Sequence, residues 1–368
     1  MRLSHNTAQV KKLPYINNIL KNNFETTPTL KALAQAHRYL GELKGLCQSM
    51  PNPAILIDSL SLQEAQDSSE IENIITTQDE IFKYRLQPNF ANAATKEVYR
   101  YTESLEYCQQ QLRNNNFITV NTIIHAQEII KGNEAGVRAQ AGTVLRNDNT
   151  QEIVYRPPEP KDLQFLLSDL EKFINDNTTS LDPLIKMAII HHQFESIHPF
   201  YDGNGRIGRI INIIYLLQQG LLDMPVLYLS RYINHNKDKY YQLLQSVRDD
   251  NTWEQWLLFM LNAIARTAKD SIILINKVKK LQQEYKYTMR QNLNKIYSQE
   301  LINNIFKYPY TKIAFLQKDL GVSRLTASRY LEKLTEEGLL TQAKFGRENY
   351  YFNHQLIKVL SNIENMRE

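Results

Sequence analysis

The sequence predicts a mainly α-helical protein with one β-hairpin and a small C-terminal module of helices and strands. Apolar residues recur at helical spacing through most of the 368 residues. Two short runs of β-branched residues, at 143–146 and 153–155, flank a polar turn and therefore predict the hairpin. After about residue 297 the pattern changes to short helices followed by two short strands.

The helical core is predicted element by element along the chain. In the N-terminal region we expect helices at 30–46, 60–72 and 95–112, with a break at Asn114–Asn116. In the central region we expect helices at 120–130, 162–174, 183–196, 207–219 and 253–269. The hairpin lies within 136–160 and turns at Asn147–Asn149. The predicted domains are an N-terminal helical region (1–115), a core (116–269), a lysine-rich connecting helix (270–296) and a C-terminal module (297–368).

The C-terminal module resembles a winged helix-turn-helix. Helices are expected at 298–306 and 312–320, and a third runs from the capping Ser323 to Glu337, before strands at 339–343 and 349–352. The start of the third helix would act as the recognition surface, with Ser323, Arg324, Thr326, Ala327 and Arg329. Arg347 in the wing would reach phosphate or the minor groove. The acidic residues nearby nearly balance the basic ones, so protein binding is the alternative; they are Glu332, Glu336, Glu337 and Glu348.

Composition narrows the class of protein. An apolar content of 42% and a charged content of 22% are those of a soluble globular chain. No apolar run approaches the roughly 20 residues that span a bilayer, and residues 1–6 have no apolar signal core. Cys47 and Cys108 lack metal-binding spacing and suggest free thiols in a reducing cytoplasm. We therefore expect a cytoplasmic protein that does not bind a membrane, and the net charge of +4 does not by itself indicate nucleic acid.

A short segment between two predicted helices concentrates residues suited to phosphate chemistry. Residues 198–209 read His-Pro-Phe-Tyr-Asp-Gly-Asn-Gly-Arg-Ile-Gly-Arg. Glycines at the start of a helix let backbone N–H groups face an anion, and the helix end adds partial positive charge. Arg206 and Arg209 offer forked donors for phosphate, Asp202 can hold Mg²⁺, and His198 suits a general base. Taken separately, each short feature also fits an ordinary turn or helix end.

This segment resembles the signature of the Fic family at every fixed position. The resemblance implies AMP transfer from ATP to a Ser, Thr or Tyr hydroxyl of a protein, with His198 as the base and Asp202 as the Mg²⁺ ligand. It implies that Arg206 contacts the β-phosphate and Arg209 the γ-phosphate, while buried Phe200 anchors the loop. The residues expected to contact ATP are Glu72, His198, Gly203, Asn204, Gly205, Arg206, Ile207, Gly208, Arg209, Tyr240 and Tyr241.

A second segment resembles the inhibitory motif of autoinhibited Fic proteins. Ser68, Glu72 and Asn73 match its Ser/Thr-x-x-x-Glu-Gly/Asn spacing, upstream of the main motif. The resemblance implies that a helix presents Glu72 to Arg209 and fills the γ-phosphate position. The alternative is a solvated acidic helix, because this spacing is common.

Two further segments resemble the family. The hairpin is similar to the Fic flap, which aligns the target backbone by strand addition; the alternative is a hairpin without a binding role. In relatives a tyrosine of a Tyr-Tyr pair borders the adenosine. Adjacent helical residues point about 100° apart, so Tyr240 and Tyr241 are not both expected to face the nucleotide. Arg248 stands where many relatives have a nucleotide-contacting Asn.

The leading hypothesis is a self-restrained protein adenylyltransferase that uses ATP and Mg²⁺, with a protein target, self-modification and a homodimer as further expectations. The alternatives are a DNA-binding regulator whose core senses nucleotide, and an enzyme that removes AMP. The resemblance implies transfer of AMP from ATP over phosphate transfer, because the glycine and arginine positions of the motif are intact.

Overall fold

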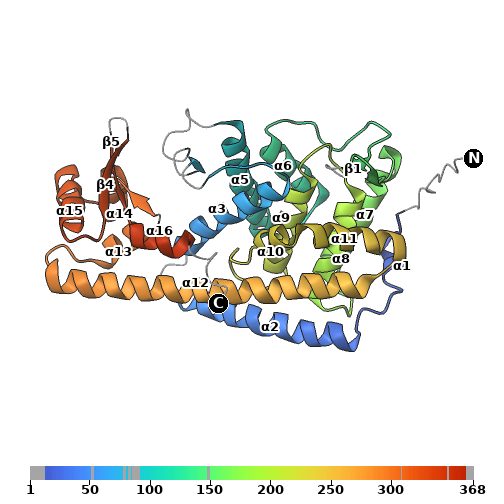
Figure 1. Cartoon of the computed structure of the whole chain (residues 1–368), viewed down its shortest axis with the longest axis horizontal. Helices are drawn as coiled ribbons and strands as arrows, with labels where there is room; N and C mark the ends of the chain where they lie inside the picture. The colour runs from blue at the N-terminus through green and yellow to red at the C-terminus, as the bar shows by residue number, and fades with distance from the viewer. Residues whose placement is uncertain are drawn as a thin grey trace, which may run out of the picture. The chain divides into compact units, whose positions relative to one another are not determined.

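The protein is mainly helical, as predicted. The computed structural model describes residues 13–50, 54–77, 80–81, 84, 92–146, 150–307, 309–345 and 348–361. Its helices, labelled in Figure 1, are α1 (Ile16–Ile19), α2 (Thr27–Gln48), α3 (Ala54–Ile71), α5 (Ala93–Asn115), α6 (Val120–Lys131), α7 (Pro160–Asn175), α8 (Pro183–Ile197), α9 (Asn204–Gln218), α10 (Ser230–His235), α11 (Lys237–Asp250), α12 (Trp253–Asn292), α13 (Gln299–Lys307), α14 (Ile313–Leu320), α15 (Arg324–Glu336) and α16 (His354–Ser361). No helix in this described part is long and apolar enough to cross a bilayer.

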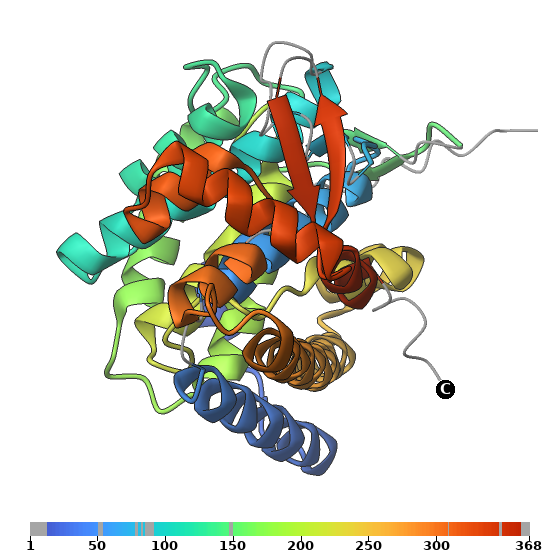
Figure 2. The same ribbon diagram turned by 90° about the vertical axis from the view of Figure 1, so that its left-hand side faces the viewer.

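The short strands form two small antiparallel sheets. In the first, β1 (Leu145–Arg146) pairs with β2 (Ile153–Tyr155), which confirms the predicted hairpin, although its turn at Asn147–Asn149 lies outside the described residues. In the second, the order is β3 (Tyr310–Thr311), β5 (Glu348–Phe352) and β4 (Thr341–Phe345). The hairpin of β4 and β5 is visible as two adjacent red arrows in Figure 2.

The chain divides into two compact units. One comprises Met1–Arg38 and Glu64–Ala265, and the other comprises Tyr39–Gln63 and Arg266–Glu368. Residues 39–63 thus group with the C-terminal part of the chain, and the division after Ala265 falls within α12. The boundaries at residues 115, 269 and 296 stay predictions.

The first unit is built around α8. Every residue from Leu184 to Ile197 is buried, because α7 and α9 pack against this helix. The indole N–H of Trp256 also donates to the carbonyl of Ala188 at 2.9 Å. Helix α9 in turn contacts α5 and α6. The loop between α8 and α9 is therefore held between two helices that the core fixes in place.

In the second unit, the later part of α12 packs with the C-terminal helices and strands. The Tyr285 hydroxyl donates to the Leu339 carbonyl and to Asn353 Oδ1, each at 2.9 Å. The expected third helix is present as α15 and is capped by Ser323. Arg347 lies outside the described residues, and contact of α15 with DNA stays a prediction.

Several elements differ from the expectations. Helices α1, α10 and α16 and strand β3 were not among the expected elements. One helix, α12, covers 253–292, where separate helices were expected before and after residue 269. Helix α3 ends at Ile71, so Glu72 lies in the turn that follows the helix instead of within it.

Candidate active site

The loop at 198–203 has a backbone set by its two ends. His198 follows α8 in the left-handed region (φ 48°, ψ 60°), and its N–H bonds to the Phe194 carbonyl at 3.0 Å. Gly203 precedes α9 with φ 87°, a conformation that favours glycine. Helix α9 consequently begins at Asn204, three residues before the start at 207 that the sequence predicts.

Phe200 and Asn204 brace this loop. The Phe200 ring is fully buried, in agreement with the expected anchor. Asn204 Oδ1 accepts from the Phe200 N–H at 2.9 Å, and Asn204 Nδ2 donates to the Phe200 carbonyl at 2.8 Å. The Asn204 side chain thus closes the loop on itself, and any contact with an anion is left to its backbone.

His198 is held by a residue that the sequence did not single out for the site. Arg138 Nε donates to the His198 carbonyl at 2.8 Å, and its Nη2 donates to the Pro158 carbonyl. The backbone N–H of Arg138 also donates to the Pro199 carbonyl at 2.9 Å. Burial, with the positive charges of Arg248 and Arg138, lowers the pKa of His198 to about 4. The imidazole is therefore neutral at pH 7, which is the form that can accept a proton.

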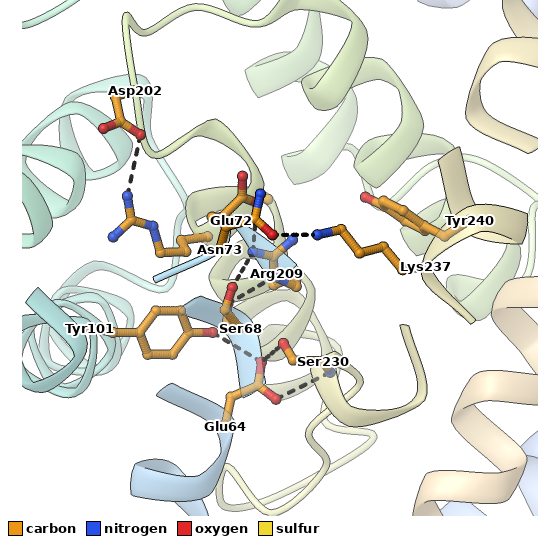
Figure 3. Close-up of polar contacts among 12 residues, drawn as sticks. Glu64, Ser68, Glu72, Asn73, Tyr101, Asp202, Arg209, Ser230, Lys237 and Tyr240 are labelled. Carbon is orange, nitrogen blue, oxygen red and sulfur yellow. Dashed lines mark hydrogen bonds and ion pairs between the residues drawn. The ribbon is translucent and has the colours of Figure 1, made fainter. Parts of the chain in front are cut away.

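Arg209 is paired with the segment around Ser68 and Glu72 (Figure 3). Its Nη2 lies 3.0 Å from Glu72 Oε1. Its Nε donates to Ser68 Oγ and its Nη2 to the Ser68 carbonyl, both at 2.8 Å. The Arg209 side chain is 1% exposed and that of Glu72 is 30% exposed. The guanidinium is thus held by acceptors from a segment remote in sequence.

The backbone explains why Gly205 and Asn73 occupy their positions. A Cβ atom on Gly205 would collide with Glu72 Oε1, so the carboxylate lies against the first turn of α9. A carboxylate is favoured there because the helix N-terminus carries partial positive charge. Asn73 adopts φ 61° directly after Glu72, and asparagine tolerates this left-handed conformation better than most residues.

Arg206 and Asp202 belong to a second set of ion pairs. Arg206 Nη1 lies 2.7 Å from Glu97 Oε1, and Arg206 Nη2 lies 3.3 Å from Asp202 Oδ1. Lys131 Nζ lies 2.6 Å from both Glu97 Oε1 and Asp202 Oδ2. Burial lowers the pKa of Lys131, but Asp202 and Glu97 outweigh it and the net direction is upward. Glu97 and Lys131 were not expected at the site, because they come from α5 and α6.

The remaining expected nucleotide contacts differ in exposure. Tyr240 is 1% exposed and its hydroxyl lies 2.8 Å from His191 Nε2, whereas Tyr241 is 43% exposed. The two rings therefore occupy different environments, as the helical geometry predicts. Ile207 is buried, and a Cβ on Gly208 would collide with Glu195 of α8. Contact of these residues with ATP stays a prediction.

The hairpin is tied to the end of α8. The Tyr155 hydroxyl donates to the Ser196 carbonyl at 2.8 Å. The Arg248 guanidinium lies over the Tyr155 ring, 3.9 Å from its centroid, and its Nε donates to Ser196 Oγ at 2.9 Å. Arg248 therefore connects α11, β2 and α8.

The residues present fit a magnesium ion held mainly by substrate oxygens. Asp202 is 58% exposed and lies next to the start of α9. Mg²⁺ is typically bound by one or two carboxylates together with phosphate oxygens. Among the described residues no group of three or more His, Cys, Asp or Glu could hold a metal, so a protein cage is not what this part of the chain offers.

Three family models match the chain. They are the Fic/DOC family N-terminal model at residues 30–110, the Fic/DOC family model at 117–216, and the C-terminal domain model of SoFic-like protein adenylyltransferases at 281–356. The chain belongs to the Fic/DOC family. The matched central segment contains the signature residues 198–209, and the N-terminal match contains Ser68, Glu72 and Asn73.

Two relatives of this Fic/DOC protein are named as protein adenylyltransferases. It is 27% identical over 173 residues to the protein adenylyltransferase Fic of Aedes aegypti, a match that covers 46% of this chain and 33% of that protein. It is 27% identical over 186 residues to a probable protein adenylyltransferase of Aquifex aeolicus, covering 48% of this chain and 54% of that protein. The match thus spans about a third of the insect relative.

Solved structures share the fold. A Fic family protein from Desulfovibrio desulfuricans superposes with a TM-score of 0.58 at 17% identity, covering 90% of this chain and 97% of that one. A Fic domain containing signaling protein from Bacteroides thetaiotaomicron superposes with a TM-score of 0.53 at 18% identity. The match covers 66% of this chain and 95% of that one. At these identities the likeness concerns the Fic fold alone.

Glu64 is a further residue that the sequence did not indicate. It lies one helical turn before Ser68 on α3, and it is 1% exposed (Figure 3). It accepts from the Tyr101 hydroxyl at 3.0 Å, from the Ser230 N–H at 3.2 Å and from the Ser230 hydroxyl. Burial raises the pKa of Glu64 to about 7 despite these donors. Glu64 thereby fastens α3 to α5 and α10.

We expect Glu64→Gln to remove part of the pH dependence of stability. The pKa of Glu64 is about 7 when folded and 4.5 as its ordinary value, so the folded state retains the proton longer. Wild-type stability should therefore fall as pH rises from about 4.5 to 7, by up to about 3 kcal/mol from this group. Urea unfolding of both proteins at pH 5 and pH 8 measures it. The free energy of unfolding of the variant should rise relative to that of wild type between pH 5 and pH 8. A difference between the two proteins that does not change with pH would contradict the raised pKa of Glu64.

Proposed function

We propose that this chain transfers AMP from ATP to a hydroxyl group of a protein, and that Glu72 restrains this reaction. The observation that carries the proposal is the state of Arg209 at the start of α9. This guanidinium, in the position that the family signature gives to a phosphate contact, is held by Glu72 and Ser68. Family membership and the names of the relatives support the reaction type.

The reaction needs a base, an anion site and charge neutralisation. Neutral His198 takes the proton from the acceptor hydroxyl, whose oxygen attacks the α-phosphorus of ATP. The bond from the α-phosphorus to the bridging oxygen breaks, and pyrophosphate leaves. The N-terminal turn of α9 and the Arg206 guanidinium stabilise the charge that develops on the phosphates. Mg²⁺ held by Asp202 and the phosphates would neutralise further charge when bound.

Restraint follows from competition for one guanidinium. The γ-phosphate of ATP and the Glu72 carboxylate are both anions that suit Arg209 and the start of α9. While Glu72 occupies this position, ATP binds without its γ-phosphate contact or in another pose. Arg138 keeps the His198 backbone in place at the same time, so the restraint acts on the substrate and leaves the base positioned.

Label transfer from ATP tests the reaction. The full chain is incubated with Mg²⁺ and ATP labelled at either the α- or the γ-phosphate, and self-modification is followed on gels and by intact mass. We expect label on protein from α-labelled ATP only, because AMP carries the α-phosphate. Label from γ-labelled ATP would instead establish phosphate transfer and overturn the proposal.

The pH dependence of transfer should lack a limb near the ordinary pKa of histidine. Burial and the charges of Arg248 and Arg138 lower the pKa of His198 to about 4, so the base is neutral from about pH 5 upward. We expect kcat/KM of a Glu72→Gly enzyme to stay level above pH 5 as far as His198 is concerned, and to fall toward pH 4. Rates are compared after each sample has been returned to pH 7.5 to exclude irreversible unfolding. A limb between pH 6 and 7 would contradict this view of His198.

A further inference from the structure

Glu97, Lys131, Asp202 and Arg206 form a closed charge cluster beside the start of α9. Lys131 Nζ lies 2.6 Å from Asp202 Oδ2 and 2.6 Å from Glu97 Oε1. Arg206 completes the cluster at 2.7 Å from Glu97 and 3.3 Å from Asp202. Two carboxylates alternate with two cations, so the charges within the cluster balance. Both oxygens of Asp202 are therefore already engaged by cations.

The position of Lys131 is built into the fold. Lys131 is the last residue of α6, where the helix dipole favours a cation. Gly132 ends the helix in the left-handed conformation (φ 65°), and its N–H bonds to the Glu128 carbonyl at 2.7 Å. The Arg100 guanidinium lies against Gly132 and fills the space that a Cβ atom would occupy there. The Lys131 side chain is only 18% exposed. Its ammonium is consequently directed at Asp202 and Glu97.

An ammonium ion and a magnesium ion seek the same oxygen atoms. Asp202 is the carboxylate of the proposed metal site, and Lys131 Nζ lies within hydrogen-bonding distance of one of its oxygens. A divalent ion bound by Asp202 would be repelled by a positive charge so close. We infer that Lys131 is a positioning residue that competes with Mg²⁺ for Asp202 and so sets the Mg²⁺ concentration that the nucleotide complex requires. This inference rests on the proposed function.

Glu97 makes the exchange feasible. Its Oε1 accepts from both Lys131 and Arg206, and its own side chain is 20% exposed. When Asp202 turns to a metal ion, Lys131 retains a carboxylate partner and is not left buried without one, which would be costly. The Lys131 ammonium can therefore keep its ion pair with Glu97 while Asp202 binds the metal ion. Glu72 and Arg209 take no part in these contacts.

Metal binding to the 368-residue chain tests the inference without relying on turnover. Mg²⁺ is titrated calorimetrically into protein saturated with ADP, and Mn²⁺ binding is followed by electron paramagnetic resonance. ADP has no γ-phosphate, so its binding does not require Arg209 to leave Glu72. We expect Lys131→Met to bind either ion about tenfold more tightly than wild type, since a nearby positive charge is removed. Lys131→Arg retains the charge and should stay close to wild type.

Two controls separate this inference from the proposed function. Lys161→Met removes the same charge at an exposed position on α7 and should leave the metal affinity unchanged. Asp202→Asn should abolish the tight metal binding. If Lys131→Met, with a native circular dichroism spectrum, binds Mg²⁺ no more tightly than wild type, the competition is refuted while the metal site stands. If Asp202→Asn binds as well as wild type, the metal role of Asp202 fails, and the inference fails with it.

Discussion

The Glu72→Gly variant is expected to modify itself about ten- to a hundredfold faster than the wild-type chain. Removal of the carboxylate frees Arg209 for the γ-phosphate of ATP. A hydrogen bond to a charged group contributes about 1.5–3 kcal/mol, and 1.4 kcal/mol is a factor of about ten. The glycine should not disturb α3, because position 72 already lies in the turn after the helix. The initial rate of label transfer from α-labelled ATP, over a range of ATP concentrations, measures the effect.

Glu70→Gly is the matched control for this change. It introduces the same substitution two residues earlier, at an exposed position on α3. Its rate should stay at the wild-type level if release depends on the carboxylate and not on loosening the helix. Arg209→Ala should not mimic Glu72→Gly, because the phosphate contact is lost together with the restraint. Equal rates for Glu72→Gly and wild type at all ATP concentrations would make Glu72 an ordinary surface carboxylate.

Replacement of His198 should reduce AMP transfer by about 10² to 10⁴ and leave ATP binding largely intact. A positioned general base contributes a factor of this size. Its loss does not remove a phosphate contact, because those are assigned to Arg206, Arg209 and the start of α9. We favour His198→Asn over His198→Ala for the measurement. Asparagine tolerates the left-handed backbone at this position (φ 48°), so the loop geometry should survive.

The rate of AMP transfer and the affinity for ATP should both be measured with His198→Asn in the Glu72→Gly background. Restraint by Glu72 would otherwise lower the rate to which the variant is compared. Calorimetry with ATP reports binding, and label transfer reports chemistry. Transfer by His198→Asn within a few-fold of its parent would exclude His198 as the base. Loss of ATP binding together with transfer would indicate a collapsed loop and contradict the assigned separation of roles.

The helical core and the loop between α8 and α9 could be predicted because their signals are local. The apolar spacing of α6 to α9, the β-branched runs of the hairpin and the glycines at 203 and 205 each act over a few residues. The alternation of helix and loop around His198 follows from the same short-range rules. The signature motif therefore located the loop and its glycine turn without knowledge of the packing.

The partners of Arg206 and Arg209 could not be predicted from local sequence patterns. Ser68 and Glu72 were found from the sequence only through a family resemblance, whereas Glu97, Lys131, Glu64 and Arg138 were not found at all. Each of them is an ordinary charged residue within a helix or a loop, with no spacing that sets it apart. Their importance arises when α3, α5 and α6 pack around α9.

The sequence by itself determined the fold class and the family, since these follow from periodicity and from one contiguous motif. Only the tertiary structure decided what the residues of that motif contact at rest: Arg209 lies with Glu72, and Asp202 lies with Lys131. The physical reason is that an ion pair depends on distances of a few ångströms between side chains far apart in the chain. Such distances are set by helix packing, about which the local sequence pattern carries little information.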